Sequence, residues 1–328
     1  MRGTQSSKPY RTVTWNIGRE GVFSAVRKEP VMKPLFLRLH RWISLAFALP
    51  LLVVIATGLI LSFEPIVQSG AIRPGSITVE SLTAALAKAD PDGKATGIVI
   101  RPWENSFGIG FGASAKSFDL ATGAPVAPGG LSGLFGASRG IHERLLFDLG
   151  WLVTASTVAM LVIVALGVLM GLPRLRNTVS GWHKGTAWFL LPLVVLSPLT
   201  GLALALGVTF TTPLTRPAGP PVSLVQAIAK VAEGHDLSGL NSIRSRAGTP
   251  MARLWEGGEL KAYSVAATGL TPIPRNWPRL LHEGNGAGLW TGLVDVVTSL
   301  ALLGLLGTGV TIWARRATRR PTRVRAAA

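Results

Sequence analysis

Four long apolar runs alternate with polar segments along the chain. The first three runs contain no charged residue, and the fourth contains only Asp295. The runs cover residues 42–63, 149–172, 185–215 and 289–314. Because a helix needs about 20 consecutive apolar residues to cross a bilayer, each run predicts one transmembrane span.

The polar segments after the first and third runs have a different pattern. Residues 76–126 begin with the helical spacing of Val79, Leu82 and Leu86, and short strand-like runs follow. Residues 222–273 repeat this order of helix and strands. Each segment predicts a small α+β domain, which is marginal in size on its own.

The second half of the chain also repeats the motifs of the first half. His40 precedes Thr57-Gly58-Leu59 by 17 residues, and His183 precedes Thr200-Gly201-Leu202 by the same spacing. Each half is therefore a span, a small domain and a second span. We expect a four-transmembrane-helix bundle built from a parallel internal duplication, with its pseudo-two-fold axis along the membrane normal.

The distribution of charge gives the expected orientation. Hydrophobic residues make up 48% of the 328 residues and charged residues only 15%, with a net charge of +17. Segments 1–41, 173–188 and 314–328 hold 18 Lys and Arg but two acids, whereas the two long connections hold 15 and 13. The positive-inside rule places both termini in the cytoplasm and both small domains in the periplasm. Topology thus explains the basic excess, and we expect no nucleic-acid partner.

These expectations divide the chain into nine parts. They are a disordered cytoplasmic arm (1–32), a first span (33–66), a first small periplasmic domain (67–138), a second span (139–173), a cytoplasmic loop (174–184), a third span (185–208), a second small periplasmic domain (209–277), a fourth span (278–314) and a basic cytoplasmic tail (315–328). Met32 resembles a natural start, and we expect a chain that begins there to insert normally.

Four of the five histidines lie at the ends of the predicted spans, one at each span. His40 and His183 belong to the cytoplasmic ends of the first and third spans, whereas His142 and His282 precede the second and fourth spans on the outside. The two-fold axis brings the members of each pair to one depth. Because imidazole is the usual axial ligand of haem, we expect two b-type haems, one for each pair.

Interpretations without a cofactor remain open for each single histidine. One histidine at a membrane boundary is commonly an interfacial residue bonded to water or lipid, but four that match the repeat favour haem. Zinc would require three or four ligands close together. His235, within the second polar segment, is expected to be solvated surface.

Basic residues beside the histidines are candidate contacts for haem propionates or for an anionic substrate. Arg41 and Lys184 flank the inner pair, where the positive-inside rule explains them equally well. Arg139, Arg144 and Arg279 flank the outer pair, where that rule does not apply.

The absence of certain residues and motifs excludes several kinds of chemistry, and Asp295 adds one candidate functional residue. There is no cysteine, which excludes disulfides, thiolate metal sites and iron–sulfur clusters. The glycines of residues 108–112 lie in a strand-like run and open no helix, so they do not form a dinucleotide site. Asp295 is a candidate functional acid because charges inside spans are costly. A proton path, a helix contact and a simple hydrogen bond to a neighbouring Ser or Thr all stay open for it.

Over residues 33–316 the chain resembles the PepSY-associated transmembrane proteins. The resemblance rests on the repeat and on the motifs Leu39-His40-Arg41-Trp42, Thr57-Gly58-Leu59, Ile141-His142-Glu143-Arg144-Leu145-Leu146 and Trp182-His183-Lys184. That family is similar to bacterial inner-membrane ferric-siderophore reductases, which hold two b-type haems and reduce iron at the periplasmic side. The resemblance implies that His40, His183, His142 and His282 are haem ligands.

We therefore expect a multi-pass oxidoreductase of the bacterial inner membrane that carries electrons to a ferric chelate or siderophore. Membrane lipid and an electron donor, either a quinol or a cytoplasmic reductase, are the other expected partners. Two alternatives remain. In the first, the protein would be a membrane-anchored peptide-binding or protease-regulating protein without redox chemistry. In the second, it would relay electrons to another periplasmic acceptor.

Overall fold

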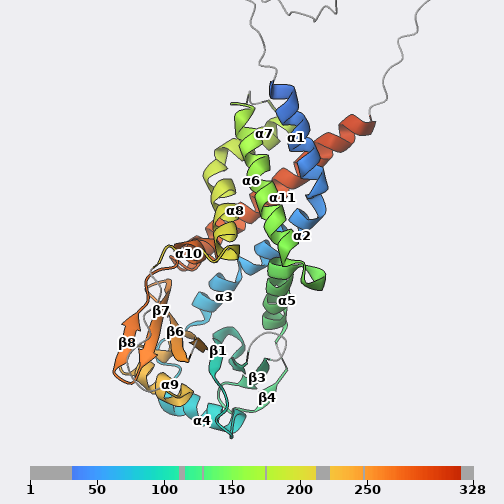
Figure 1. Ribbon diagram of the computed structural model, residues 1–328. Helices are drawn as coiled ribbons and strands as arrows, with labels where there is room; N and C mark the ends of the chain where they lie inside the picture. Colours follow the sequence, from blue (N-terminus) through green and yellow to red (C-terminus); the bar gives the residue numbers. More distant parts are fainter. Residues whose placement is uncertain are drawn as a thin grey trace, which may run out of the picture.

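The computed structural model describes residues 32–110, 115–127, 129–173, 176–211, 222–246 and 248–318. A helical bundle stands above one β-sheet, and both ends of the described chain lie at the bundle end away from the sheet (Figure 1). Most of the expected arm and tail falls outside the described residues, which begin at Met32 and end at Thr318.

Three helical stretches of the described chain are long and apolar enough to cross a membrane, and a bent pair supplies a fourth span if it is counted as one. They are Ala48–Ala71, Gly150–Leu169, Leu289–Thr318 and the pair Val179–Phe189 with Leu191–Ala205. These elements correspond to the four apolar runs of the sequence. The chain therefore has the helices of a membrane protein.

Breaks divide the first and third apolar runs of the sequence, which the apolar pattern did not predict. Helices α1 (Met32–Ala46) and α2 (Ala48–Leu61) are separated at Phe47. Helices α7 (Val179–Phe189) and α8 (Leu191–Ala205) meet at an angle of 66°. Pro50 and Pro192 follow the two breaks. Proline has no N–H for the carbonyl four residues earlier, and its ring crowds that carbonyl. Counted as one span, the pair of α7 and α8 begins at Val179, whereas the sequence predicts a third span that begins at residue 185.

The second and fourth spans are each preceded by a separate short helix. Helix α5 (Gly130–Arg144) ends before the short 3-10 turn η3 (Leu146–Asp148), and α6 (Gly150–Leu169) follows. Leu145, Phe147 and Asp148 all have positive φ, a conformation that non-glycine residues rarely adopt. Likewise α10 (Trp277–His282) precedes α11 (Leu289–Thr318). The predicted second span, 139–173, thus contains the end of one helix and all of another.

Within the described residues, eight strands form one antiparallel sheet in the order β4-β3-β2-β1-β5-β6-β7-β8. The strands are β1 (Gly97–Arg101), β2 (Ser106–Ile109), β3 (Lys116–Asp119), β4 (Pro125–Val126), β5 (Leu240–Arg246), β6 (Thr249–Glu256), β7 (Glu259–Ala266) and β8 (Gly269–Pro272). Strand β1 pairs with β5, with Val99 opposite Ser242. The two polar segments, expected to fold as two domains, therefore share one sheet. Their pairing covers two strand edges that would otherwise be open to other chains.

Helices α4 (Val79–Ala89) and α9 (Leu224–Ala232) cover the face of the sheet away from the bundle (Figure 1). The core between them and the sheet draws on both segments, since Leu82, Ile98, Ile228 and Ile243 are all fully buried. Both helices begin with a capping box, in which a Ser or Thr side chain bonds the third backbone N–H. A third helix, α3 (Glu64–Ala71), leads from α2 toward the sheet.

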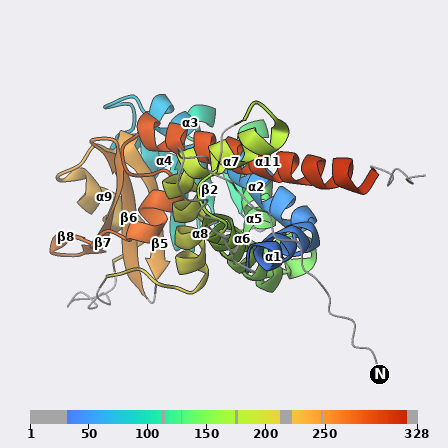
Figure 2. The same cartoon turned by 90° about the horizontal axis from the view of Figure 1, so that it is seen from above.

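The bundle has a small core and an apolar outer surface. Leu51, Ile55, Val194 and Leu302 form the core, from α2, α8 and α11. Exposed tryptophans lie near the ends of the apolar helices, as is typical at membrane interfaces: Trp42, Trp151, Trp182 and Trp290. Seen from above, the C-terminal part of α11 projects away from the other helices (Figure 2).

Candidate functional site

The first candidate site is a pair of histidines at the sheet end of the bundle. His142 on α5 and His282 on α10 come from opposite halves of the chain, and their ring centroids lie 6.0 Å apart. Helices α5 and α2 pack together, as do α10 and α8. Each ring therefore lies against a helix of its own half of the chain, α2 for His142 and α8 for His282. We call these two residues the outer pair.

A second pair lies near the opposite end of the bundle. His40 on α1 and His183 on α7 have ring centroids 6.4 Å apart, in an edge-to-face arrangement. We call them the inner pair. Fourteen residues of helix separate His40 from Val54, where His142 docks, which is about 20 Å at 1.5 Å per residue. The structure thus brings together the histidines that the sequence paired, in two separate places.

Every ring uses its Nδ1 atom for a hydrogen bond to a neighbouring helix. The acceptors are the Ile163 carbonyl for His40 (2.9 Å), the Val54 carbonyl for His142 (2.9 Å), the Ser197 carbonyl for His282 (3.1 Å) and the Thr308 hydroxyl for His183 (2.9 Å). A carbonyl oxygen can only accept, so Nδ1 carries the proton in three of the rings. The Thr308 hydroxyl donates to the carbonyl of Gly304 (2.6 Å), so it accepts from His183. In all four rings the lone pair is consequently on Nε2.

The repeated dipeptides Thr57-Gly58 and Thr200-Gly201 lie directly against the rings of the outer pair, and we call them the seats of this pair. The hydroxyl of Thr57 lies 3.3 Å from Nδ1 of His142. The hydroxyl of Thr200 lies 3.3 Å from Nδ1 of His282. A Cβ placed on Gly58 would lie 3.1 Å from Cε1 of His142. The equivalent Cβ on Gly201 would lie 2.9 Å from Cε1 of His282. The sequence marked these dipeptides as repeats without a role, and their fixed spacing from a histidine was the available signal.

Glycines also lie beside the inner pair, in a less regular way. A Cβ on Gly167 would lie 4.0 Å from Cε1 of His40, and one on Gly309 would lie 3.6 Å from Cε1 of His183. Gly307, which matches Gly167 by spacing in the sequence, has open space at its Cβ position. The repeat therefore predicts the seats of the outer pair better than those of the inner pair.

The predicted basic residues differ in their surroundings. Arg139 forms an ion pair with Glu64, and Arg279 lies 3.3 Å from Glu283. The guanidinium of Arg41 lies 5.4 Å from the ring centroid of Trp42. Within the described residues, Arg144 and Lys184 form no ion pair.

Two further polar residues have environments that the sequence left open or misjudged. The Asp295 carboxylate packs against Gly284, since a Cβ on that glycine would lie 2.6 Å from Oδ2. It thus contacts the turn that follows His282. His235 was expected to be solvated surface, which is wrong, because it bonds the Glu256 carboxylate and its ring centroid lies 4.8 Å from that of Tyr263.

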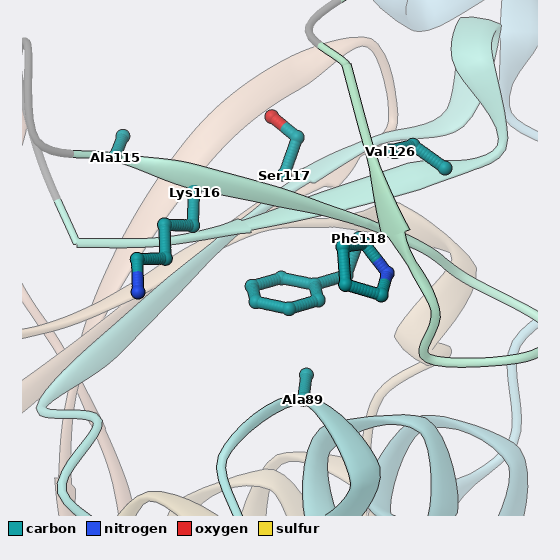
Figure 3. A pocket seen from close by; sticks show the side chains of 7 residues that line it. Ala89, Ala115, Lys116, Ser117, Phe118 and Val126 are labelled. Carbon is teal, nitrogen blue, oxygen red and sulfur yellow. The ribbon is translucent and has the colours of Figure 1, made fainter.

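Elsewhere in the described part of the chain, the options for a site are few. A pocket of about 430 Å³ lies between the end of α4 and strands β3 and β4, where Lys116 and Phe118 line it (Figure 3). Among the described residues, no group of three or more His, Asp or Glu side chains is placed to hold a metal ion. The two histidine pairs are therefore the strongest candidates for chemistry.

A bundle of apolar helices above an antiparallel sheet, with paired histidines among the helices, defines a membrane protein with a polar domain at one end. The family model for the PepSY-associated TM region matches residues 37–316, so the chain belongs to that family. No curated protein matches the chain.

Proposed function

We propose that this protein is a di-haem oxidoreductase of the bacterial inner membrane that passes electrons across the membrane to ferric iron held by a siderophore. The observation that carries the proposal is the separation of the two histidine pairs along the bundle. One pair lies on α5 and α10, the helices next to the sheet, and the other lies on α1 and α7, at the end of the bundle where the described chain begins and ends (Figure 1). The basic segments at those ends favour a cytoplasmic location for them.

The spacing within each pair suits one metal ion between two rings. An imidazole nitrogen binds a transition metal at about 2 Å, and the ring centre lies about 1 Å behind it, so opposed rings have centroids about 6 Å apart. The observed separations are 6.0 Å and 6.4 Å. No covalent attachment motif is present, in keeping with b-type haem.

The chain's own groups prepare the rings for this role. Because Nδ1 of each ring donates to a neighbouring helix, Nε2 is left as the metal ligand and the ring cannot turn freely. Gly58 and Gly201 allow the outer rings to approach the helix backbone closely. A haem bound at each pair would supply one-electron transfer, and the residues that would hold it are His40 and His183 at the inner pair and His142 and His282 at the outer pair.

The sheet end is where a hydrophilic ferric chelate can reach the protein. Such a chelate cannot enter the hydrocarbon core cheaply, and the sheet domain lies outside the bundle of apolar helices (Figure 1). The inner pair would accept electrons from a quinol or a cytoplasmic reductase. Relay to another periplasmic acceptor would use the same two histidine pairs.

One observation favours the non-redox alternative. The pocket beside β3 and β4 lies at one edge of the sheet, where an extended peptide could add to the short strand β4 (Figure 3). This alternative gives no role to the two histidine pairs.

The experiment that tests the proposal is a visible absorption spectrum of the purified full-length protein, with a haem assay. We expect two low-spin haems per chain, and reoxidation of the reduced protein by a ferric chelate with Fe(II) trapped by a ferrous-specific dye. A protein without haem would favour the peptide-binding alternative. A haem protein that stays reduced with every ferric chelate would favour the electron relay.

A further inference from the structure

The face of the sheet toward the bundle is polar, unlike the face that packs on α4 and α9. Strands alternate their side chains between two faces, and several residues on the face opposite to the buried core carry charge or hydroxyls. On the central strands β1, β5 and β6 these residues include Arg101, Ser242, Arg244 and Arg253. Ser242 lies directly across from Arg253 in the sheet.

Arg253 connects this sheet face to the outer pair. Its guanidinium lies 3.6 Å from Glu283, the residue that follows His282. Arg279 on α10 approaches the other oxygen of the same carboxylate, at 3.3 Å. One arginine from the sheet and one from α10 thus share the glutamate that follows His282.

Two more arginines act on the same place. Burial lowers the pKa of Arg244, and the charges of Arg253, Arg139 and Arg279 lower it further, with Glu283 opposing them. Burial likewise lowers the pKa of Arg253, which Glu283 opposes and which Arg279 and Arg139 reinforce. Arg139, Arg244, Arg253 and Arg279 therefore lie within electrostatic reach of one another.

Three glutamates lie close to this cluster. Glu283 lies at both Arg253 and Arg279, Glu64 pairs with Arg139, and Glu143 also acts on Arg139. Each guanidinium group has five N–H donors, and Arg253 and Arg279 each have one contact with Glu283. An anion placed there would relieve the repulsion between the arginines.

We propose that Arg139, Arg244, Arg253 and Arg279, the junction cluster, form a binding site for carboxylate groups next to the outer histidine pair. The guanidinium group is planar and presents a fork of N–H donors that matches a carboxylate. Glu283 already occupies two of these forks from within the protein. The site deepens the proposed function, on which it rests, by naming a polycarboxylate chelate or the haem propionates as the source of the carboxylates.

A second observation on the same sheet face agrees with a ligand site. Trp255 lies two residues after Arg253 on β6, so both side chains are on one face. Trp255 is 8% exposed, and its indole Nε1–H has no hydrogen-bond partner among the described residues. Buried donors are nearly always paired, and a bound polar ligand is one means of pairing this one.

The test uses the full-length protein in detergent and a redox-inert probe, the gallium(III)–citrate complex. Isothermal titration calorimetry measures the affinity of the protein for this probe. Arg253→Lys keeps the positive charge but removes the fork, and Arg253→Gln removes both. Arg275→Gln is the matched control, because Arg275 pairs with Glu259 at the sheet surface and lies outside the cluster. Haem content and the rate of haem loss are measured on the same samples.

We expect each Arg253 variant to weaken one kind of carboxylate binding about tenfold or more. Weaker gallium–citrate binding with normal haem retention assigns the site to the chelate. Faster haem loss with unchanged gallium–citrate binding assigns it to the propionates. If neither changes, or if Arg275→Gln has an equal effect, the carboxylate site is wrong. Because gallium is not reduced, this result is independent of whether the protein reduces iron.

Discussion

His142 donates a 2.9 Å hydrogen bond from Nδ1 to the backbone carbonyl of Val54, in the middle of α2. In the other half of the chain, His282 bonds the carbonyl of Ser197 on α8 in the same way, at 3.1 Å. Each carbonyl fixes the proton on Nδ1 and leaves Nε2 with its lone pair. The helices of the bundle therefore set both the position and the tautomer of the outer pair.

The first prediction concerns the assignment of ligands to haems. His142→Ala or His282→Ala should remove the outer haem and keep the inner one, because each variant takes one ligand from a single pair. His40→Ala or His183→Ala should do the reverse. The measurement is haem content together with a redox titration, in which one of two transitions disappears.

His235→Ala is the matched control for these variants. It removes the remaining histidine of the chain, which bonds Glu256 far from either pair in the sequence. Both haems should be retained. Equal loss of haem in all five variants would show that the histidines act on folding and not as ligands.

A second prediction tests the glycine seats of the outer pair. Gly58→Ala and Gly201→Ala place a methyl group 3.1 Å and 2.9 Å from the ring carbons, so the rings must shift. We expect weaker binding of the outer haem, by roughly the 10–100-fold typical of altered support around a metal ligand. Gly307→Ala, which meets open space, is the control. Normal haem affinity in both seat variants would remove the support role.

Several of these relations were predictable from sequence, and others were not. The spacing of His40 and His183 from their Thr-Gly dipeptides revealed the repeat, and an axis of symmetry then pairs the histidines. The spacing did not reveal that Gly58 supports His142, because that contact joins residues that are distant in sequence. The pairing of β1 with β5 was equally hidden, since each polar segment read as a complete small domain.

The junction cluster shows the same limit. Arg139 and Arg279 stand close to histidines in the sequence and were candidates for that reason. Arg253 is in the middle of β6, where one arginine among strand residues has no local signal. Only the antiparallel sheet, which faces the bundle as a whole, brings it to Glu283.

The third prediction is the orientation in the membrane. Reporter fusions at Gly93 and Gly248, both in turns of the sheet domain with positive φ, should read periplasmic. A fusion at Asn177, before α7, should read cytoplasmic. The basic excess of the segments at the opposite end of the bundle is the reason. A cytoplasmic signal at Gly248 would invert the proposed direction of electron flow.

A fourth prediction follows from Glu256 in the sheet domain. Burial raises the pKa of this carboxyl, but hydrogen bonds from Tyr263 and His235 outweigh burial, and the pKa is lowered from 4.5. A lowered pKa in the folded state stabilises the protein above the unfolded value, and this contribution is lost as the pH falls through the folded value. Glu256→Gln should therefore lower the apparent Tm at about pH 7 and have little effect on it at about pH 3.

Thermal unfolding in detergent at several pH values measures this effect. Tyr263→Phe removes one of the two donors and should reproduce part of the loss, since a hydrogen bond to a charged group contributes about 1.5–3 kcal/mol. An equal loss for Glu256→Gln at all pH values would assign the effect to packing and not to the charge.

The last prediction concerns where ferric iron is reduced. The outer pair lies at the junction with the sheet domain, and the junction cluster adds positive charge there. The inner pair lies about 20 Å away along the helices, on the far side of apolar side chains that a charged chelate does not cross cheaply. In the His142→Ala variant, reductant added to the inner side should still reduce the remaining haem, because His40 and His183 are unchanged. Production of Fe(II) from a ferric chelate should nevertheless stop, since no redox centre remains within reach of the sheet end. The matched variant His235→Ala should produce Fe(II) at the wild-type rate. Full Fe(II) production by His142→Ala would place the reducing site elsewhere on the protein.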